Sequence, residues 1–223
     1  MKLKNDIKIL ITCDSGAAAG KTTAAKYLSK KFDLKLLTSG LLYRYIAYNL
    51  IVSKKNHSDH SFLKKIIRKI NYRNLKNKNL YSPKVTEYTA EIAKIKKIRQ
   101  MLKNYQKNFS KKKRAVLEGR DMGILFPNAD IKFFFKCSLK TAAKRRFKEF
   151  KKTDNKITLK KVEKAIKSRN RADSTRKFSP LRIPPGAVIV DTTNINKKQM
   201  FRRIYKIVDK KLLLKYGKSY RKK

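Results

Sequence analysis

The alternation of strand and helix patterns along the 223-residue chain predicts an α/β fold with a doubly wound parallel sheet. Apolar runs typical of strands recur at 7–13, 34–38, 115–118, 131–137 and 187–191. Helical periodicity lies between and after them, near 22–32, 41–52, 62–70, 86–109, 139–150, 158–170 and 197–214. Phe133 to Phe135 are apolar without alternation, as in parallel strands covered on both faces. Ligands of such folds bind at the carboxyl ends of the strands.

A loop of small residues joins the first predicted strand to the first helix. Residues 15–22 read SGAAAGKT. Backbone N–H groups of such a loop surround phosphates, the lysine reaches the β- and γ-oxygens, and the following hydroxyl is offered to Mg²⁺. The predicted ATP-binding residues are Ser15, Gly16, Ala17, Ala18, Ala19, Gly20, Lys21, Thr22 and Thr23, with Thr22 as the Mg²⁺ ligand. The alternative is an ordinary turn of small residues, which GK[ST] at a strand–helix junction disfavours.

Ser15 stands where such loops normally have their first glycine, and the glycine is displaced to Gly16. If φ is positive at Ser15, we expect backbone strain on the order of 1 kcal/mol there.

Composition limits the compartment and the chemistry. No apolar run approaches the roughly 18 residues of a membrane span, and the N-terminus MKLKNDIKIL lacks a signal-peptide pattern. We therefore expect a cytoplasmic protein with no membrane partner. Cys13 and Cys137 both fall in predicted strands, so they are interpreted as core thiols of a reducing compartment.

The charge balance is extreme, with 61 Lys and Arg against 15 Asp and Glu and a formal net charge of +46. The basic residues are spread over nearly every predicted helix and linker, which favours a compositional bias over a dedicated nucleic-acid face. Non-specific polyanion binding at low salt is expected in either case.

Four further segments fall at predicted strand ends or in the helices that follow. They are TSGLLYR at 38–44, EGRDMG at 118–123, AAKRR at 142–146 and RNRADSTR at 169–176. With SGAAAGKTT, with FPNAD and SPL after the second and fourth segments, and with VIVDTT at 188–193, they resemble the bacterial cytidylate kinases. These are the CMP/dCMP kinase branch of the P-loop nucleoside monophosphate kinases. The likeness runs from about residue 7 to 208, and GRD-x-G together with DSTR distinguishes this branch from adenylate and guanylate kinases.

The resemblance implies Mg²⁺-dependent transfer of the ATP γ-phosphoryl group to CMP or dCMP. It implies that Arg44, Arg120 and Arg169 hold the CMP phosphate through guanidinium forks. It also implies that Asp121 and Arg99 recognise cytosine, since the N4 amino group needs an acceptor and N3 and O2 need donors. Uracil would turn O4 toward the same carboxylate, so UMP should be rejected.

The remaining implied roles concern the ribose and the transferring group. Asp173 and Arg176 match residues that contact the ribose, and Ser39 lies at the mouth of the same pocket. The residues implied to stabilise the transferring phosphoryl group are Lys21, Arg145, Arg146 and Arg169. Asp14, beside the loop, is a further candidate for orienting Mg²⁺-bound water or the acceptor phosphate.

Departures from the family pattern bear on selectivity and turnover. Ala90 replaces a serine that joins cytosine recognition, Tyr81 and Ser82 replace an Arg–Thr pair, and Ala172 replaces an arginine of the lid. We interpret them as drift in an active enzyme, and the alternative is a paralogue that has lost activity.

The expected organisation is a P-loop kinase core at 1–52 and 86–215, with a lid at about 140–176. A polar insert at 53–85 forms the NMP-binding lobe, and 216–223 is a basic tail; residues 215–223 are expected to be frayed. We expect a monomer. Two alternatives stay open: a P-loop kinase acting on UMP, AMP or a non-nucleotide acceptor, and a basic RNA-binding module built on a P-loop fold.

Overall fold

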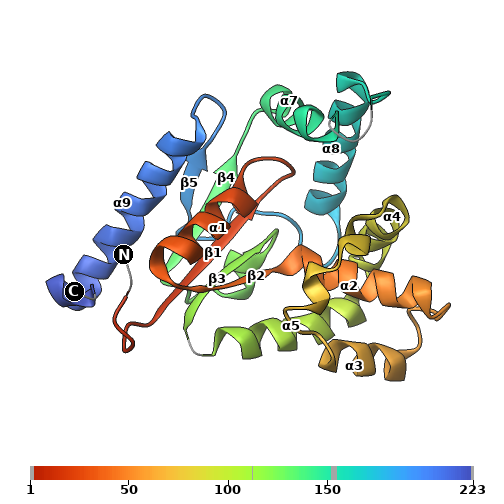
Figure 1. Ribbon diagram of the computed structural model, residues 1–223, viewed down its shortest axis with the longest axis horizontal. Helices are drawn as coiled ribbons and strands as arrows, with labels where there is room; N and C mark the ends of the chain where they lie inside the picture. Colours follow the sequence, from red (N-terminus) through yellow and green to blue (C-terminus); the bar gives the residue numbers. More distant parts are fainter. Residues whose placement is uncertain (1–2, 112, 152–154, 222–223) are drawn as a thin grey trace. The chain divides into compact units, whose positions relative to one another are not determined.

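The computed structural model describes residues 3–111, 113–151 and 155–221, and the chain forms two compact units (Figure 1). The first unit contains the described residues up to Leu36 and those from Lys113 onward, and the second is Leu37–Lys111. The second unit is wider than the insert expected at 53–85, because it includes the helices on either side of that segment.

A five-stranded sheet confirms the predicted α/β fold. Its strands are β1 Ile9–Ser15, β2 Lys35–Thr38, β3 Arg114–Gly119, β4 Ile131–Lys136 and β5 Val188–Asp191, in the order β2-β3-β1-β4-β5. β1 pairs in parallel with β3 and with β4, and β4 pairs in parallel with β5. Because the strand order reverses on either side of β1, this strand ends at the topological switch point where such folds bind ligands.

The helices of the first unit are α1 Lys21–Phe32, α6 Met122–Leu125, α7 Leu139–Phe150, α8 Leu159–Thr175 and α9 Lys197–Tyr216, followed by the 3₁₀ turn η3 Gly217–Tyr220. α1 and α9 pack together against the sheet (Figure 1). The rings of Tyr27 and Phe201 stack with their centroids 4.2 Å apart. Apolar side chains from both helices and from β1 and β4 form the main core. This packing fixes the N-terminus of α1 at the end of β1.

The second unit is helical. It contains α2 Ser39–Val52, α3 His60–Arg68, the 3₁₀ turns η1 Asn74–Lys76 and η2 Lys78–Tyr81, α4 Pro83–Ile92 and α5 Lys96–Ser110. The single helix expected at 86–109 is two helices, because Ile95 is extended and starts α5 as its N-cap. α4 begins with Pro83 at its first position and the Ser82 hydroxyl as its cap, both common at helix starts.

The C-terminal tail is ordered through Arg221, so the expected frayed tail is wrong for these residues. Tyr220 is only 1% exposed, and its carbonyl accepts a hydrogen bond from the Lys4 amide at 3.1 Å. Arg221 forms an antiparallel bridge with Leu3, and the Tyr220 hydroxyl bonds to Asp209. The charge of the tail suggested that it would be solvated, but the buried ring of Tyr220 holds it against the first unit. Residues 222–223 lie outside the described part.

Two expectations from composition can be compared with the structure. Among the helices of the described residues, none has the length and apolar character needed to span a bilayer. Cys13 is buried in β1 and Cys137, which directly follows β4, is half-buried; both are free thiols.

Candidate active site

The loop between β1 and α1 has the backbone strain at a different residue from the one expected. Ser15 is the last, buried residue of β1, and its hydroxyl donates to the Gly16 carbonyl at 2.7 Å. Positive φ occurs instead at Ala18, with φ of 56°, and at Gly20, with φ of 88°. Gly20 is the N-cap of α1 and carries no side chain to satisfy the helix's first N–H groups. Those donors are left for an anion, which is the arrangement a phosphate-binding helix requires.

Lys21 is buried at the start of α1 beside a carboxylate at the end of β3. Its Nζ lies 3.6 Å from Glu118 Oε1, and the Thr22 hydroxyl donates to the same oxygen at 2.9 Å. Burial, together with the positive charges of Arg120 and Arg169, lowers the pKa of Lys21 from 10.5 to about 8. A negatively charged group bound beside Lys21 would therefore stabilise its charged ammonium form.

The other oxygen of Glu118, Oε2, is buried and has no hydrogen-bond partner among the described residues. An unsatisfied buried carboxylate oxygen is costly unless a ligand or water completes it. Next to the Thr22 hydroxyl, it fits the outer shell of a hydrated Mg²⁺, which prefers oxygen ligands and keeps several waters. The chain therefore has suitable donors for the predicted metal at this point.

Asp14 has a structural role that differs from the one expected. Its Oδ1 accepts the Met122 amide at 2.9 Å and its Oδ2 accepts the Gly123 amide at 2.6 Å, which satisfies the start of α6. Burial raises its pKa from 3.8 to about 7 despite these two hydrogen bonds. Because the side chain is fully buried and both oxygens accept backbone hydrogen bonds, Asp14 positions the turn after GRD.

The GRD and DSTR segments meet through a cluster of alternating charges. Arg120 Nε donates to Asp173 Oδ2 at 2.8 Å, and an Arg176 guanidinium nitrogen lies 3.3 Å from Asp173 Oδ1. The other terminal nitrogen of Arg176 lies 3.9 Å from Asp121 Oδ1. Burial raises the pKa of Asp173, but Arg120, Arg169 and Arg176 outweigh it and hold the pKa below 3.8. Four residues from two distant motifs are thus joined in one cluster of ion pairs.

Arg145 and Arg146 of α7 have their polar contacts elsewhere. Arg145 donates to the Thr192 hydroxyl at 3.0 Å, to the Thr192 carbonyl at 2.6 Å and to the Ile195 carbonyl at 3.4 Å. Thr192 in turn donates to the carbonyl of Ala19 at 3.2 Å, which connects Arg145 to the P-loop by one intermediate residue. Arg146 pairs with Glu149 at 2.8 Å on the surface of α7.

Three predicted site residues belong to the second unit. The Ser39 hydroxyl accepts a hydrogen bond from Gln106 at 2.8 Å. Arg44 donates to the Leu80 carbonyl at 2.7 Å and to the Thr86 hydroxyl at 2.9 Å. Arg99, on α5, is 9% exposed and donates to the Ala93 carbonyl at 3.0 Å. Both arginines are therefore oriented by fixed neighbours within their own unit.

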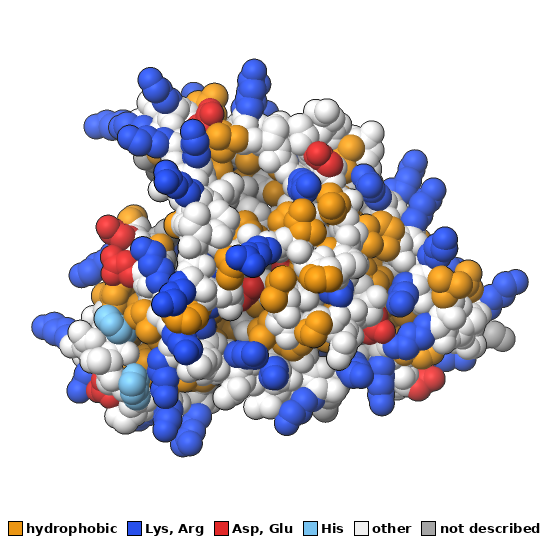
Figure 2. Space-filling model, turned by 180° about the vertical axis from the view of Figure 1, so that it is seen from behind, with side chains coloured by type: hydrophobic (Ala, Val, Ile, Leu, Met, Phe, Trp, Pro, Cys, Tyr) orange, Lys and Arg blue, Asp and Glu red, His pale blue; other side chains and the backbone are white. Residues whose placement is uncertain are grey.

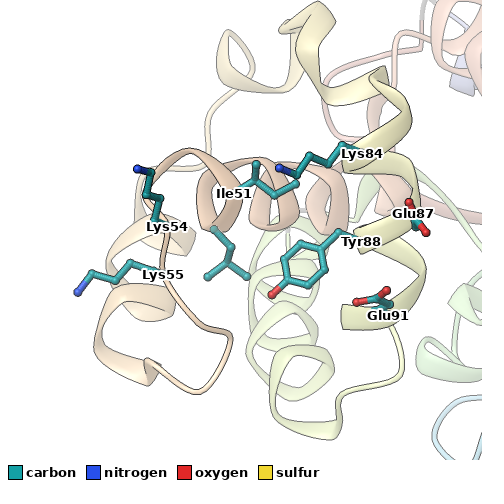
Figure 3. A pocket seen from close by; sticks show the side chains of 8 residues that line it. Ile51, Lys54, Lys55, Lys84, Glu87, Tyr88 and Glu91 are labelled. Carbon is teal, nitrogen blue, oxygen red and sulfur yellow. The ribbon is translucent and has the colours of Figure 1, made fainter.

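A hollow of about 330 Å³ in the second unit contains none of the predicted site residues (Figure 3). It is lined by Leu50, Ile51, Lys54, Lys55, Lys84, Glu87, Tyr88 and Glu91. Figure 3 shows Tyr88 between Lys54 and Lys55 on one side and Glu87 and Glu91 on the other. Because the lining mixes both signs of charge, it offers no preference for a phosphate.

Sequence reasoning gave no role to Glu118 or Asn170, although both lie inside quoted motifs. Glu118 could have been found from its position at the carboxyl end of a predicted strand, directly before GRD. Asn170, whose amide oxygen accepts the Ala17 N–H at 2.8 Å, left no signal in the sequence because the contact spans 153 positions.

A parallel sheet with a lysine and a threonine presented at the helix after β1 defines a P-loop nucleotide-binding protein. A family model described as cytidylate kinase matches residues 11–210. The chain therefore belongs to the cytidylate kinase family.

Relatives cover nearly the whole chain. A cytidylate kinase of Fusobacterium nucleatum is 33% identical over 214 residues, which cover 91% of this chain and 98% of that protein. One from Clostridium tetani is 31% identical, covering 95% of this chain and 99% of that protein. A crystal structure of an uncharacterized protein from Eubacterium ventriosum is 15% identical with a TM-score of 0.56, covers 91% of this chain and 99% of that one, and supports the fold alone.

Proposed function

We propose that this protein transfers the γ-phosphoryl group of ATP to CMP or dCMP, giving ADP and CDP or dCDP. Membership of the cytidylate kinase family supports the reaction class. The observation that carries the site assignment is the Arg120–Asp173–Arg176–Asp121 cluster beside a buried P-loop lysine. Alignment of two nucleotides and stabilisation of phosphoryl charge are what such a transfer requires, so no covalent intermediate is needed.

The donor side is built by the P-loop. The N–H groups at the start of α1 face the phosphates, and Lys21 balances the charge that develops on the β- and γ-oxygens. Mg²⁺, when bound, neutralises phosphate charge and polarises the transferring group. Thr22 is the proposed ligand, with Glu118 accepting hydrogen bonds from metal-bound water. Glu118→Gln should raise the Mg²⁺ concentration that half-saturates ATP binding, measured by nucleotide fluorescence without turnover, while ATP binding without metal changes little.

On the acceptor side, Arg44, Arg120 and Arg169 are proposed to hold the CMP phosphate, and Asp121 and Arg99 to read the base. Asp173, Arg176 and Ser39 are proposed to serve the ribose. In the structure the Asp121 carboxylate is buried, and its Oδ1 lies 3.9 Å from a guanidinium nitrogen of Arg176. A buried carboxylate is the acceptor that the cytosine N4 amino group needs.

Arg145, Arg146 and Arg169 remain proposed charge-stabilising residues, and they differ in support. The charge of Arg169 reaches Lys21 strongly enough to lower its pKa, which supports a place near the phosphates. Arg145 is connected to the loop indirectly, because it donates to the Thr192 hydroxyl, which donates to the Ala19 carbonyl.

A coupled assay on CMP, dCMP, UMP and AMP tests the assignment. CMP should exceed UMP by at least tenfold in kcat/KM, about 1.4 kcal/mol. Asp121→Asn should reduce this ratio, since an amide N–H can donate to uracil O4, whereas Asp173→Asn should lower turnover and leave the ratio unchanged. Equal rates on CMP and UMP in the wild type would refute Asp121 as the base reader. Preferred turnover of UMP, AMP or a non-nucleotide acceptor would favour the alternative that this protein is a P-loop kinase with another acceptor.

Non-specific polyanion binding and a monomeric state are the partner proposals. Lys and Arg side chains are spread across the face in Figure 2 without forming one stripe. RNA binding should therefore be independent of sequence and become negligible by roughly 0.2 M salt, while CMP turnover persists. Light scattering should give the monomer mass, because a net charge of +46 repels copies of the chain. Selective RNA binding at about 0.3 M salt with no kinase activity would favour the RNA-binding module.

A further inference from the structure

Asn170 of α8 contacts the P-loop through its side-chain amide. Its Oδ1 accepts the backbone N–H of Ala17 at 2.8 Å. Because a backbone N–H can only donate, this contact fixes which way the amide faces, with oxygen toward Ala17. The two N–H donors of Nδ2 then lie on the opposite edge of the amide.

The same amide lies where the side chain of any other residue at position 16 would begin. A Cβ at Gly16 would lie 2.9 Å from Asn170 Oδ1, 3.1 Å from Nδ2 and 3.2 Å from Cγ. The φ angle of Gly16 is not in the left-handed region, unlike that of Gly20. Its backbone conformation therefore does not require glycine, whereas a Cβ at this position would make the Asn170 amide shift away from the loop. The displaced glycine of SGAAAGKT therefore leaves room for the side chain of Asn170 on α8.

We propose that Asn170 is a positioning residue for phosphoryl transfer, holding the P-loop at Ala17 in a fixed relation to α8. This inference rests on the proposed function and extends it. α8 also carries Arg169 and Asp173, which are proposed to hold the acceptor nucleotide. A single hydrogen bond from the same helix turn to the donor loop thus couples the two substrates, and a small misplacement of either lowers the rate of transfer.

The neutral amide suits this position. Lys21, Arg120 and Arg169 give the loop positive potential, which attracts phosphates. An aspartate at 170 would accept the same N–H, but its negative charge would lie beside the ATP phosphates. Asn170→Asp should therefore keep the loop ordered and raise the KM for ATP severalfold, whereas Asn170→Ala should release the loop.

A different role would give the opposite result. If Asn170 only occupied the Ala17 N–H until a phosphate displaced it, removing the side chain would lower the KM for ATP and leave kcat unchanged. That outcome overturns the proposal.

The first experiment compares Asn170→Ala with Ser168→Ala, an exposed residue on the same helix. Asn170→Ala should lower kcat about five- to tenfold, the loss expected for one ordered hydrogen bond, with the KM for CMP within about twofold of wild type. Without nucleotide, amide exchange at Ala17 should become faster in Asn170→Ala and stay at the wild-type rate in Ser168→Ala. Unchanged exchange and unchanged kcat in Asn170→Ala would refute the proposal.

The second experiment is a double-mutant cycle with Gly16→Ala. The added methyl displaces Asn170, so Gly16→Ala alone should reduce kcat by about the same factor as Asn170→Ala. In the Asn170→Ala background the methyl has room, so Gly16→Ala should cause no further loss. Equal fold losses in both backgrounds would overturn the link between the two residues. Failure of the proposed function is seen separately, as absence of CMP turnover in the wild type. The contact can still be tested in that case, by amide exchange at Ala17 and by the same double-mutant cycle with the free energy of unfolding in urea as its readout.

Discussion

The two ends of the sheet in the first unit bury opposite kinds of side chain. At the carboxyl end of β1, Asp14 and Lys21 are buried with Glu118, and burial shifts the first two pKa values toward neutrality, to about 7 and about 8. At the other end, Tyr220 and Phe32 are 1% and 0% exposed in an apolar cluster. Buried charges cost free energy of folding, whereas buried apolar surface supplies it. The comparison indicates that the buried charges at one end cost free energy of folding, whereas the apolar side chains at the other end contribute to it, so variants at the two ends should differ in what they change.

Removing the buried ammonium should have the largest effect. Lys21→Ala should lower kcat about a thousandfold, or about 4 kcal/mol in activation free energy, because the lysine balances charge that grows during transfer. CMP binding should be largely retained. Lys26→Ala, at an exposed position of the same helix, is the matched control and should keep wild-type turnover. Retention of more than about a tenth of the turnover by Lys21→Ala would remove the P-loop from the catalytic centre.

The apolar end should respond in stability rather than in rate. Tyr220→Ala leaves a cavity in the cluster and removes the hydroxyl contact with Asp209, so the free energy of unfolding should fall by about 3 kcal/mol. Urea denaturation measures it. Tyr72, which is 73% exposed, is the control, and Tyr72→Ala should change stability by less than about 0.5 kcal/mol. Under conditions where both variants are folded, their kcat should equal that of the wild type. A Tyr220→Ala protein with unchanged stability would show that the tail is not a structural element.

The titration of Lys21 should change activity and stability at alkaline pH. The pKa of Lys21 is about 8 in the folded protein against 10.5 ordinarily, so kcat/KM for ATP should fall about tenfold per pH unit above pH 8. Between pH 8 and 10.5 the unfolded state binds more protons at this lysine, so its contribution to the free energy of unfolding rises with pH. Activity and this stability term should thus move in opposite directions. In Lys21→Arg, which stays charged, the alkaline fall should be absent, and a fall of the same size there would assign it to another group.

The smallest effect concerns the strained loop residue. Ala18 has φ of 56°, so Ala18→Gly should raise the free energy of unfolding by up to about 1 kcal/mol. Ala17 lies next to it without positive φ, and Ala17→Gly should lower stability by about 0.5 to 1 kcal/mol, since only the unfolded chain gains freedom. Changes of the same sign at both positions would show that backbone strain does not reside at Ala18.

Local sequence determined most of the fold and the donor half of the site. Strands and helices were predicted because apolar periodicity reflects which face of each element is buried, and GK[ST] at a strand–helix junction marks a phosphate loop by itself. The break between α4 and α5 was not predicted, because helical periodicity continues through Ile95 while the backbone there is extended. The family motifs supplied the acceptor residues, whose roles stay predictions.

Only the tertiary structure decided which residues share a contact across long stretches of chain. It brought Arg120 to Asp173, Thr22 to Glu118 and Asn170 to Ala17, and it placed Tyr220 in the core. It also moved the expected strain from Ser15 to Ala18 and gave Asp14 a backbone-capping role. Periodicity and motifs record the local environment of a residue, whereas pairing, burial of a charge and the shift of its pKa depend on which distant side chains pack against it. The sequence therefore specified the loop, and the packing of β1, β3 and α8 around that loop determined its electrostatics.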